Sequence, residues 1–376
     1  MSPRIALVSR DVAGIGGTVT TILEHAKRLS AKGWAVEVFG ERLDADAIRA
    51  AGAQPRAIWG LPFGSTVKRK YFAWRAQSLT AGFDLVHGHG DQLKQDVLSL
   101  HNCVHAAHEL IHGAPLPSGG VGELHALQLK ERRFRHLICN SKLMRDDVMS
   151  RFGVPAEASS VIYPGHDPAR FNAAGDPAVR RQMRGLLSFL ETDVVFGLIT
   201  SGDFEKRGVD VFISALGHAA TRLRGTLRAL IMGKEKHVGP YRRQVVAEGL
   251  GEVVSFLPPS TQVERFYRAL DVYVHPAHFE EFGQSVQEAL ACGLPVLSNK
   301  RVGAAELMQG EAREYLLERT NADELASEIT VLAGDPGLRQ RLGALGPRSA
   351  AANTWDSNFA ATASVYERLL PTTKKG

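Results

Sequence analysis

The sequence predicts an α/β protein made of two doubly wound, Rossmann-like domains. A chain of 376 residues exceeds the length at which one hydrophobic core usually stops growing, so two domains are expected. Apolar runs at residues 4–9 and 34–40 flank a helical stretch at 18–32, which gives a strand, helix, strand unit near the start. A second strand, loop and helix pattern begins at residue 194, so the chain contains two such arrays.

The composition is that of a globular protein from a reducing compartment. Hydrophobic residues make up 44% and charged residues 23% of the chain, which argues against disorder. Cys103, Cys139 and Cys292 are scattered and have neither the spacing of a zinc site nor the number of a disulfide framework. We find no signal-peptide pattern and no apolar run of the roughly 18 residues that a membrane span needs. We therefore expect a cytoplasmic protein, or one that is peripheral on the inner membrane face.

The formal charge of +5 is unevenly distributed. Lys and Arg outnumber Asp and Glu by five in residues 1–165 and equal them in residues 166–376. We interpret the excess as the mark of an anionic partner of the first half of the chain.

Residues 66–77 interleave cations with aromatic rings. A helix of this composition would lie on an anionic membrane surface, with its rings at the level of the lipid headgroups. The pattern is equally typical of a helix that covers the first sheet and leaves a solvated basic edge, and both interpretations stay open. The residues concerned are Lys68, Arg69, Lys70, Tyr71, Phe72, Trp74 and Arg75.

A glycine-rich turn follows the first strand. Gly14, Gly16 and Gly17 let the backbone approach whatever lies at the carboxyl end of that strand. Together with Glu41 after the second strand, this arrangement is also how a nicotinamide-binding domain begins, although the third glycine of that fingerprint is missing. A nicotinamide-dependent oxidoreductase is therefore an alternative, and a plain turn is another.

Two groups of residues invite a metal hypothesis. Asp44 and Asp46 form an Asp-x-Asp string, but Asp44 opens an Ala-rich helical stretch, where aspartate is a common N-cap. His87, His89 and His101 follow two predicted strands, but no carboxylate is clearly placed with them. We expect a helix cap in the first case and no metal in either.

A basic pair follows the first strand of the second array. Residues 194–200 form the predicted strand, Lys206 and Arg207 lie in the next loop, and an amphipathic helix begins at Val209. Cations at this place in a Rossmann-like domain can neutralise a diphosphate.

Two glutamates bracket a predicted helix start near residue 283. Glu280 precedes Phe282 and Gly283, and Glu288 follows eight positions after Glu280, inside a helix predicted at residues 284–291. The first-turn N–H groups of such a helix form an anion site. An acid, a phosphate cradle and a second acid match the sugar, diphosphate and ribose of a nucleotide-sugar, since carboxylates accept short hydrogen bonds from vicinal hydroxyls.

The string HFEEFGQSVQEALACGLPV resembles the E-x7-E signature of retaining glycosyltransferases of family 4, glycosyl transferases group 1. This resemblance implies the GT-B architecture, in which two Rossmann-like domains face each other across a cleft. The expected acceptor-binding domain covers residues 1–165 and the nucleotide-sugar-binding domain covers residues 166–353. A closing helix in residues 354–376 is expected to pack back on the first domain.

The resemblance also implies a role for each candidate residue. Glu280 would hold hydroxyls of the donor sugar and Glu288 would hold the ribose. The basic pair would stabilise the diphosphate, and His101 would contact the sugar or a phosphate. The residues assigned to catalysis are Glu280, His101, Lys206 and Arg207. Those assigned to donor binding are Gly16, Gly17, Lys206, Arg207, Phe282, Gly283, Gln284, Ser285 and Glu288.

The reaction implied by the resemblance is the metal-independent transfer of a hexose from a UDP- or GDP-sugar to a glycan, with retention and without a cofactor. Where the family usually carries an Arg before a Lys-Gly pair, this chain has Ser201, so the charge falls on Lys206 and Arg207. The string DFEKRGVD further resembles lipopolysaccharide-core glucosyltransferases, which implies a cell-envelope glycan, lipid-linked or not, as the acceptor and no nucleic acid partner. A non-enzymatic nucleotide-sugar-binding protein is the remaining alternative.

Overall fold

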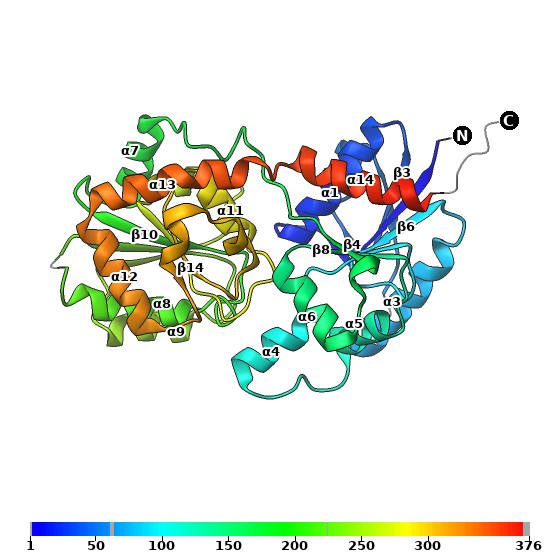
Figure 1. Ribbon diagram of the computed structural model, residues 1–376, viewed down its shortest axis with the longest axis horizontal. Coiled ribbons are helices and arrows are strands. Elements are labelled where there is room, and N and C mark those ends of the chain that lie inside the picture. Colours follow the sequence, from blue (N-terminus) through cyan, green and yellow to red (C-terminus); the bar gives the residue numbers. More distant parts are fainter. Residues whose placement is uncertain (1, 61–63, 224, 371–376) are drawn as a thin grey trace. The chain divides into compact units, whose positions relative to one another are not determined.

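The structure, a computed structural model, describes residues 2–60, 64–223 and 225–370 (Figure 1). The chain forms two compact units. Unit 1 comprises Met1–Gly165 together with Trp355–Gly376, and unit 2 is the continuous segment His166–Thr354.

Unit 1 is built on a seven-stranded parallel sheet with the order β5-β3-β1-β6-β7-β8-β9. The central strand β1 pairs with β3 on one side and β6 on the other. The strands are β1 (Arg4–Val8), β3 (Ala35–Gly40), β5 (Gln54–Ala57), β6 (Leu85–Gly88), β7 (Val97–Ser99), β8 (His136–Cys139) and β9 (Ser159–Val161), and the short strands β2 (Asp11–Val12) and β4 (Arg42–Leu43) pair separately.

Helices follow most strands of unit 1, as parallel connections require. The helices are α1 (Gly17–Ala31), α2 (Ala45–Ala50), α3 (Ser65–Leu79), α4 (Val104–His112), α5 (Gly120–Lys130), α6 (Lys142–Phe152), the 3-10 turn η1 (Ala156–Ala158) and α14 (Trp355–Leu369).

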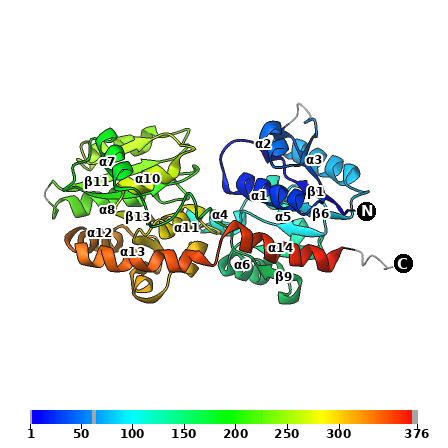
Figure 2. The same cartoon turned by 90° about the horizontal axis from the view of Figure 1, so that it is seen from above.

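Helix α14 supplies part of the core of unit 1 although it comes last in the chain. Phe359 and Tyr366 pack in the same apolar cluster as Ile5 and Leu7 of β1. The Tyr366 hydroxyl lies 2.5 Å from Nδ1 of His87 on β6. The helix lies beside α1 in both views (Figure 1 and Figure 2). The first and the last segments of the sequence therefore share one core.

Unit 2 is built on a six-stranded parallel sheet with the order β12-β11-β10-β13-β14-β15. The chain adds β11 and β12 on one side of β10, and then returns to add β13 to β15 on the other side. The strands are β10 (Val194–Ile199), β11 (Leu227–Met232), β12 (Val254–Leu257), β13 (Val272–His275), β14 (Val296–Asn299) and β15 (Leu316–Leu317). Strand order reverses between β10 and β13, which is where open parallel sheets bind ligands.

Helices cover both faces of the unit 2 sheet. In Figure 1, α8, α9 and α12 lie below the strands, and α7, α11 and α13 lie above them. The helices are α7 (Pro177–Leu186), α8 (Val209–Ala220), α9 (Gly239–Ala247), α10 (Val263–Ala269), α11 (Gln284–Ala291), α12 (Ala322–Gly334) and α13 (Pro336–Ala351), with 3-10 turns η2 (Gly303–Leu307) and η3 (Gly310–Tyr315).

Several sequence predictions are confirmed element by element. The strands predicted at residues 4–9, 34–40 and 194–200 are β1, β3 and β10, and the helix predicted at residues 284–291 is α11. Asp44 caps α2 by accepting a 3.0 Å hydrogen bond from the Ala47 amide, as expected, and Asp46 pairs with Arg49.

Within the described residues, no helix combines the length and the apolar character that crossing a bilayer requires. In that same part of the chain, no three His, Cys, Asp or Glu side chains are grouped so that they could hold a metal ion.

Candidate active site

The loops after β10 and β13 meet at the point where the strand order of unit 2 reverses. The two strands pair in parallel, so both loops leave the same edge of the sheet. The His278 amide donates a 2.9 Å hydrogen bond to the Lys206 carbonyl, which ties the loops together. Gly208 has φ +65°, and a Cβ there would lie 2.3 Å from the Pro276 carbonyl oxygen, so only glycine permits this approach.

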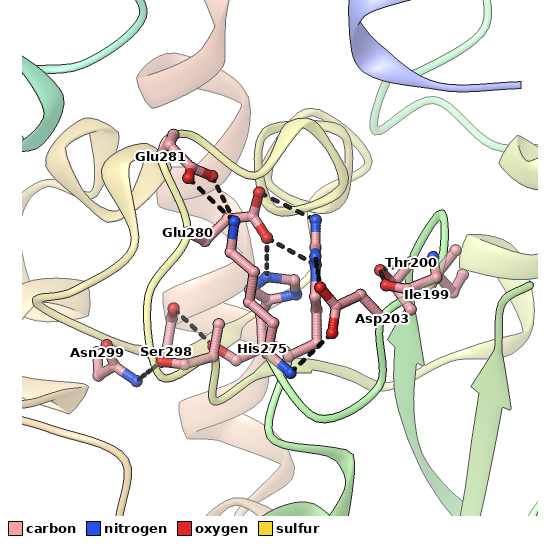
Figure 3. A network of polar contacts seen from close by, with 12 residues as sticks. Ile199, Thr200, Asp203, His275, Glu280, Glu281, Ser298 and Asn299 are labelled. Carbon is pink, nitrogen blue, oxygen red and sulfur yellow. Dashed lines mark hydrogen bonds and ion pairs between the residues drawn. The ribbon is translucent and has the colours of Figure 1, made fainter. Parts of the chain in front are cut away.

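Arg207 and Glu280 form an ion pair between these loops (Figure 3). The Arg207 Nε atom lies 2.8 Å from Glu280 Oε2, and Nη2 donates to Oε1 at 3.3 Å. His275, the last residue of β13, places Nε2 at 3.7 Å from Oε2. Burial alone would raise the pKa of Glu280, but the Arg207 charge, with His275 and Lys206, outweighs it and lowers that pKa. Glu280 is therefore an ionised carboxylate.

Lys206 pairs with Glu281, the residue next to Glu280. Its ammonium donates to both carboxylate oxygens, at 3.0 Å and 2.7 Å, and both side chains are buried. Both cations of the predicted phosphate site are thus bound to acids of the β13 loop (Figure 3). Because these four charges balance, a diphosphate that takes up Lys206 or Arg207 must compete with a glutamate for it.

Glu288 lies in the second half of α11, and a tyrosine donates a hydrogen bond to it. The Tyr267 hydroxyl is 2.9 Å from Glu288 Oε2 and 3.1 Å from the Ser285 carbonyl oxygen. Desolvation by the surrounding side chains raises the pKa of Glu288 to about 7, although the Tyr267 hydrogen bond opposes that rise. Glu288 therefore changes its charge near neutral pH, in contrast to Glu280.

Gly283 is the N-cap residue of α11, and its φ of +91° is a left-handed conformation that favours glycine. Since Gly283 has no side chain to cap the helix, the first-turn amides of Gln284 and Ser285 are left for an anion. Phe282 is 2% exposed, so its side chain anchors this loop in the core.

Unit 1 carries the other candidate residues. Gly16 precedes α1 and Gly17 is its first residue, and a Cβ on Gly16 would meet nothing within 4 Å. His101 follows β7, and its Nε2 atom lies 2.8 Å from Nδ1 of His89. Burial lowers the pKa of His101 to about 4, so this imidazole is neutral at physiological pH.

The structure adds three residues to the candidate site of unit 2 that the sequence interpretation missed. Glu281 adjoins Glu280 but lies outside the E-x7-E register, and its pairing with Lys206 depends on the two loops meeting. Tyr267 is 21 residues from Glu288, and no local spacing connects them. His275 had a weak signal in the sequence, because it lies just before the signature, at the end of β13.

The fold and this loop arrangement define a nucleotide-sugar-dependent glycosyltransferase of the GT-B architecture. Residues 15–170 match the family described as Glycosyltransferase Family 4, and residues 193–348 match the family described as Glycosyl transferases group 1. The chain therefore belongs to the family 4 glycosyltransferases, which confirms the predicted family, fold class and transferase activity and sets aside the nicotinamide-dependent oxidoreductase.

Similar proteins of known name or structure cover nearly the whole chain. A D-inositol 3-phosphate glycosyltransferase of Streptomyces bingchenggensis is 29% identical over 94% of this chain and 85% of its own length. The crystal structure of WaaG, a glycosyltransferase involved in lipopolysaccharide biosynthesis, superimposes with a TM-score of 0.82 at 18% identity, covering 96% of this chain and 99% of that chain. Anabaena Alr3699/HepE in complex with UDP-glucose gives a TM-score of 0.80 at 18% identity, covering 97% and 100%.

Proposed function

We propose that this protein transfers a hexose from a UDP-sugar, with retention of configuration, to an acceptor that carries a phosphate group. The observation that carries the donor half is the meeting of the β10 and β13 loops at the strand-order reversal, with Glu280 ionised and Glu288 held by Tyr267. The UDP-glucose complex of the structurally similar Anabaena protein supports a UDP-sugar as the donor.

The roles proposed within unit 2 follow from charge. Glu288 accepts hydrogen bonds from the ribose hydroxyls, and Glu280 accepts them from the sugar, each as a carboxylate. Lys206, Arg207 and the amides that begin α11 stabilise the leaving diphosphate, which is the electrostatic work that a metal performs in other transferases. We therefore expect full turnover in the presence of EDTA. A loss of activity that Mg²⁺ restores would contradict the proposed metal-independent stabilisation of the diphosphate.

The proposed roles of Glu280 and Glu288 can be distinguished by mutation. Glu288→Ala should weaken UDP binding by about 1 to 3 kcal/mol, the range for hydrogen bonds to a charged group. Glu280→Gln should lower turnover while UDP binding stays close to that of the wild type. Isothermal titration with UDP and steady-state kinetics measure the two effects, and Glu318→Gln, an exposed glutamate paired with Lys300, is the control. Equal losses of UDP affinity in both variants would overturn the assignment.

The acceptor proposal rests on charge and on relatives. The excess of five cations in residues 1–165 favours an anionic acceptor, and a curated relative over most of the chain is named for D-inositol 3-phosphate. The lipopolysaccharide link of WaaG supports a phosphorylated cell-envelope glycan as the second candidate. UDP release should rise on adding D-inositol 3-phosphate or a phosphorylated core oligosaccharide, but not free inositol. Equal rates with inositol and with its phosphate would contradict a phosphate-dependent acceptor site.

We also propose that α3 holds the enzyme at an anionic membrane surface. Val67 and Trp74 are 52% and 56% exposed and lie two turns apart on the helix. The Arg75 guanidinium lies 5.7 Å from the centre of the Trp74 indole ring. Exposed apolar side chains beside cations favour an interfacial helix. Phe72 is buried and Arg69 pairs with Asp91, so this surface is smaller than residues 66–77 suggested.

A further inference from the structure

Unit 1 contains a row of stacked imidazoles that ends at His101. The ring centres of His87 and His89 are 4.4 Å apart, and those of His89 and His101 are 5.1 Å apart with an interplanar angle of 11°. Nδ1 of His89 and Nε2 of His101 are 2.8 Å apart, which is a hydrogen bond between two side chains that can each donate or accept. The direction of that bond decides which nitrogen of His101 carries its proton.

Both rings are neutral at physiological pH. Burial lowers the pKa of His89 well below its usual value and that of His101 to about 4. A neutral imidazole has one N–H donor and one bare nitrogen. Exactly one ring of the pair therefore donates, and the other ring accepts.

The buried environment of His89 determines which of the two rings donates the hydrogen bond. Its Nε2 atom is buried and has no hydrogen-bond partner among the described residues. If His101 donated, His89 would carry its own proton on Nε2, as an orphaned buried N–H group. If His89 donates from Nδ1, only a bare nitrogen is orphaned, and native proteins tolerate unsatisfied acceptors better than unsatisfied N–H donors. The neighbouring His87 offers no competing donor, since its nitrogens are engaged by Tyr366 and Ser99.

We propose that His89 is a positioning residue that fixes His101 as the Nδ1–H tautomer. Nδ1 of His101 makes no hydrogen bond to any described residue and is not among the buried unpaired atoms, so it is the nitrogen available to a ligand. His101 then presents an N–H donor to a sugar or phosphate oxygen of a ligand, and cannot accept a proton as a base. The ligand contact rests on the proposed function, but the tautomer does not.

The tautomer can be read directly. Long-range ¹H–¹⁵N correlation spectra of the full-length protein labelled at histidine report which ring nitrogen carries the proton. His101 and His89 are assigned from His101→Asn and His89→Asn. We expect the proton of His101 on Nδ1 at pH 7.5. A proton on Nε2 of His101 in the wild-type protein would overturn the proposal without any activity measurement.

Two substitutions of His89 test whether its N–H group fixes the tautomer of His101. His89→Asn keeps an N–H donor close to the Nδ1 position and should preserve the Nδ1–H tautomer of His101. His89→Leu removes the donor and should move the proton of His101 to Nε2, with kcat/KM about fivefold lower, since one neutral hydrogen bond contributes on the order of 1 kcal/mol. An unchanged tautomer in a folded His89→Leu protein would overturn the role of His89, and the wild-type and His89→Asn spectra decide if that variant does not fold. A shifted tautomer with unchanged kcat/KM would leave the role of His89 intact and remove His101 from the proposed site.

Discussion

Glu288 makes the stability of the unliganded protein depend on pH. Its pKa is raised from 4.5 to about 7, so between these values the folded protein binds a proton that the unfolded chain releases. Stability therefore falls as pH rises through this window. Glu288→Gln should raise the free energy of unfolding at pH 8 by about 3 kcal/mol and have little effect at pH 5, since each pKa unit between 4.5 and about 7 corresponds to about 1.4 kcal/mol.

Urea unfolding at the two pH values measures this effect. Glu318→Gln, which changes an exposed glutamate, serves as the control for the loss of one negative charge. An equal gain of stability at pH 5 and pH 8 would show that Glu288 stays ionised throughout, and would contradict the raised pKa.

The residues of the candidate site divide into those that local spacing predicts and those that only tertiary structure brings in. Glu280 and Glu288 follow from the E-x7-E spacing, because the helix between them fixes their separation. The pairing of Arg207 with Glu280 joins residues 73 apart, so it follows from the sheet order and from no pattern in the chain. The partners of Lys206 and Glu288 were missed for the same reason.

Two arginines attach helix α7 to the rest of unit 2, and one of them, Arg184, is buried. Arg184 is 1% exposed and donates to Asp271 at 2.5 Å and to the Asp193 carbonyl oxygen at 3.1 Å. Asp271 also accepts a hydrogen bond from Arg180. This carboxylate therefore keeps one cationic partner when Arg184 is removed, which reduces the destabilisation. Arg184→Met should still destabilise the protein by about 3 kcal/mol, because breaking a buried ion pair leaves a carboxylate short of partners.

Calorimetry of Arg184→Met and of Arg181→Met provides the comparison. Arg181 is exposed on the same helix, so its replacement controls for helix propensity and net charge. Similar melting temperatures for the two variants would show that the buried guanidinium contributes little.

Helix α3 predicts a salt-dependent attachment to anionic vesicles. A variant with Lys68→Gln, Trp74→Ser and Arg75→Gln should cosediment at least about tenfold less at low salt, since each cation near the surface contributes on the order of 1 kcal/mol. Binding of the wild type should weaken as the Debye length shortens from about 10 Å at 0.1 M to about 3 Å at 1 M. The control is Lys94→Gln with Arg132→Gln, two exposed cations of unit 1 outside α3. If the wild-type protein does not bind anionic vesicles, α3 is a helix with a solvated basic edge and no membrane contact.

Unit 1 as a whole should be the acid-sensitive part of the molecule. Several of its histidines are buried, and that burial lowers their pKa. Below pH 6.5 the unfolded chain therefore binds protons that folded unit 1 does not bind. Stability should therefore fall as pH drops from 6.5 towards 4, by about 1 to 2 kcal/mol per histidine at pH 5. The histidines are His25, His87, His89, His101 and His125.

The tryptophans make this loss observable. All four tryptophans, Trp34, Trp59, Trp74 and Trp355, belong to unit 1. Their fluorescence should change at a higher pH than the circular dichroism of the whole protein, and His125→Gln should move that change to lower pH. A single transition below pH 4 in both signals would contradict the prediction.

At the scale of the whole molecule, much of the strand and helix order was predictable because most of the parallel strands are followed by a helix. The reversal of strand order at β10 was not predictable from the residues, since it depends on which strands pair across segments far apart in the chain. The short pair β2 and β4, two residues per strand, is too brief to leave a periodic signal. Resemblance to a family supplied the architecture that periodicity alone left open.

The placement of Phe359 and Tyr366 in the core of unit 1 also orders events during synthesis. Residues 1–165 leave the ribosome before unit 2, but their core is completed by α14, which is translated after unit 2. Unit 2 is continuous and has all of its residues available earlier, so it is the first part that can complete its fold, in contrast to the usual order from the N-terminus. Nascent residues 1–165 must therefore stay soluble with part of their sheet uncovered until α14 has been translated. A ribosome stalled before residue 355 would carry a complete unit 2 and an incomplete unit 1.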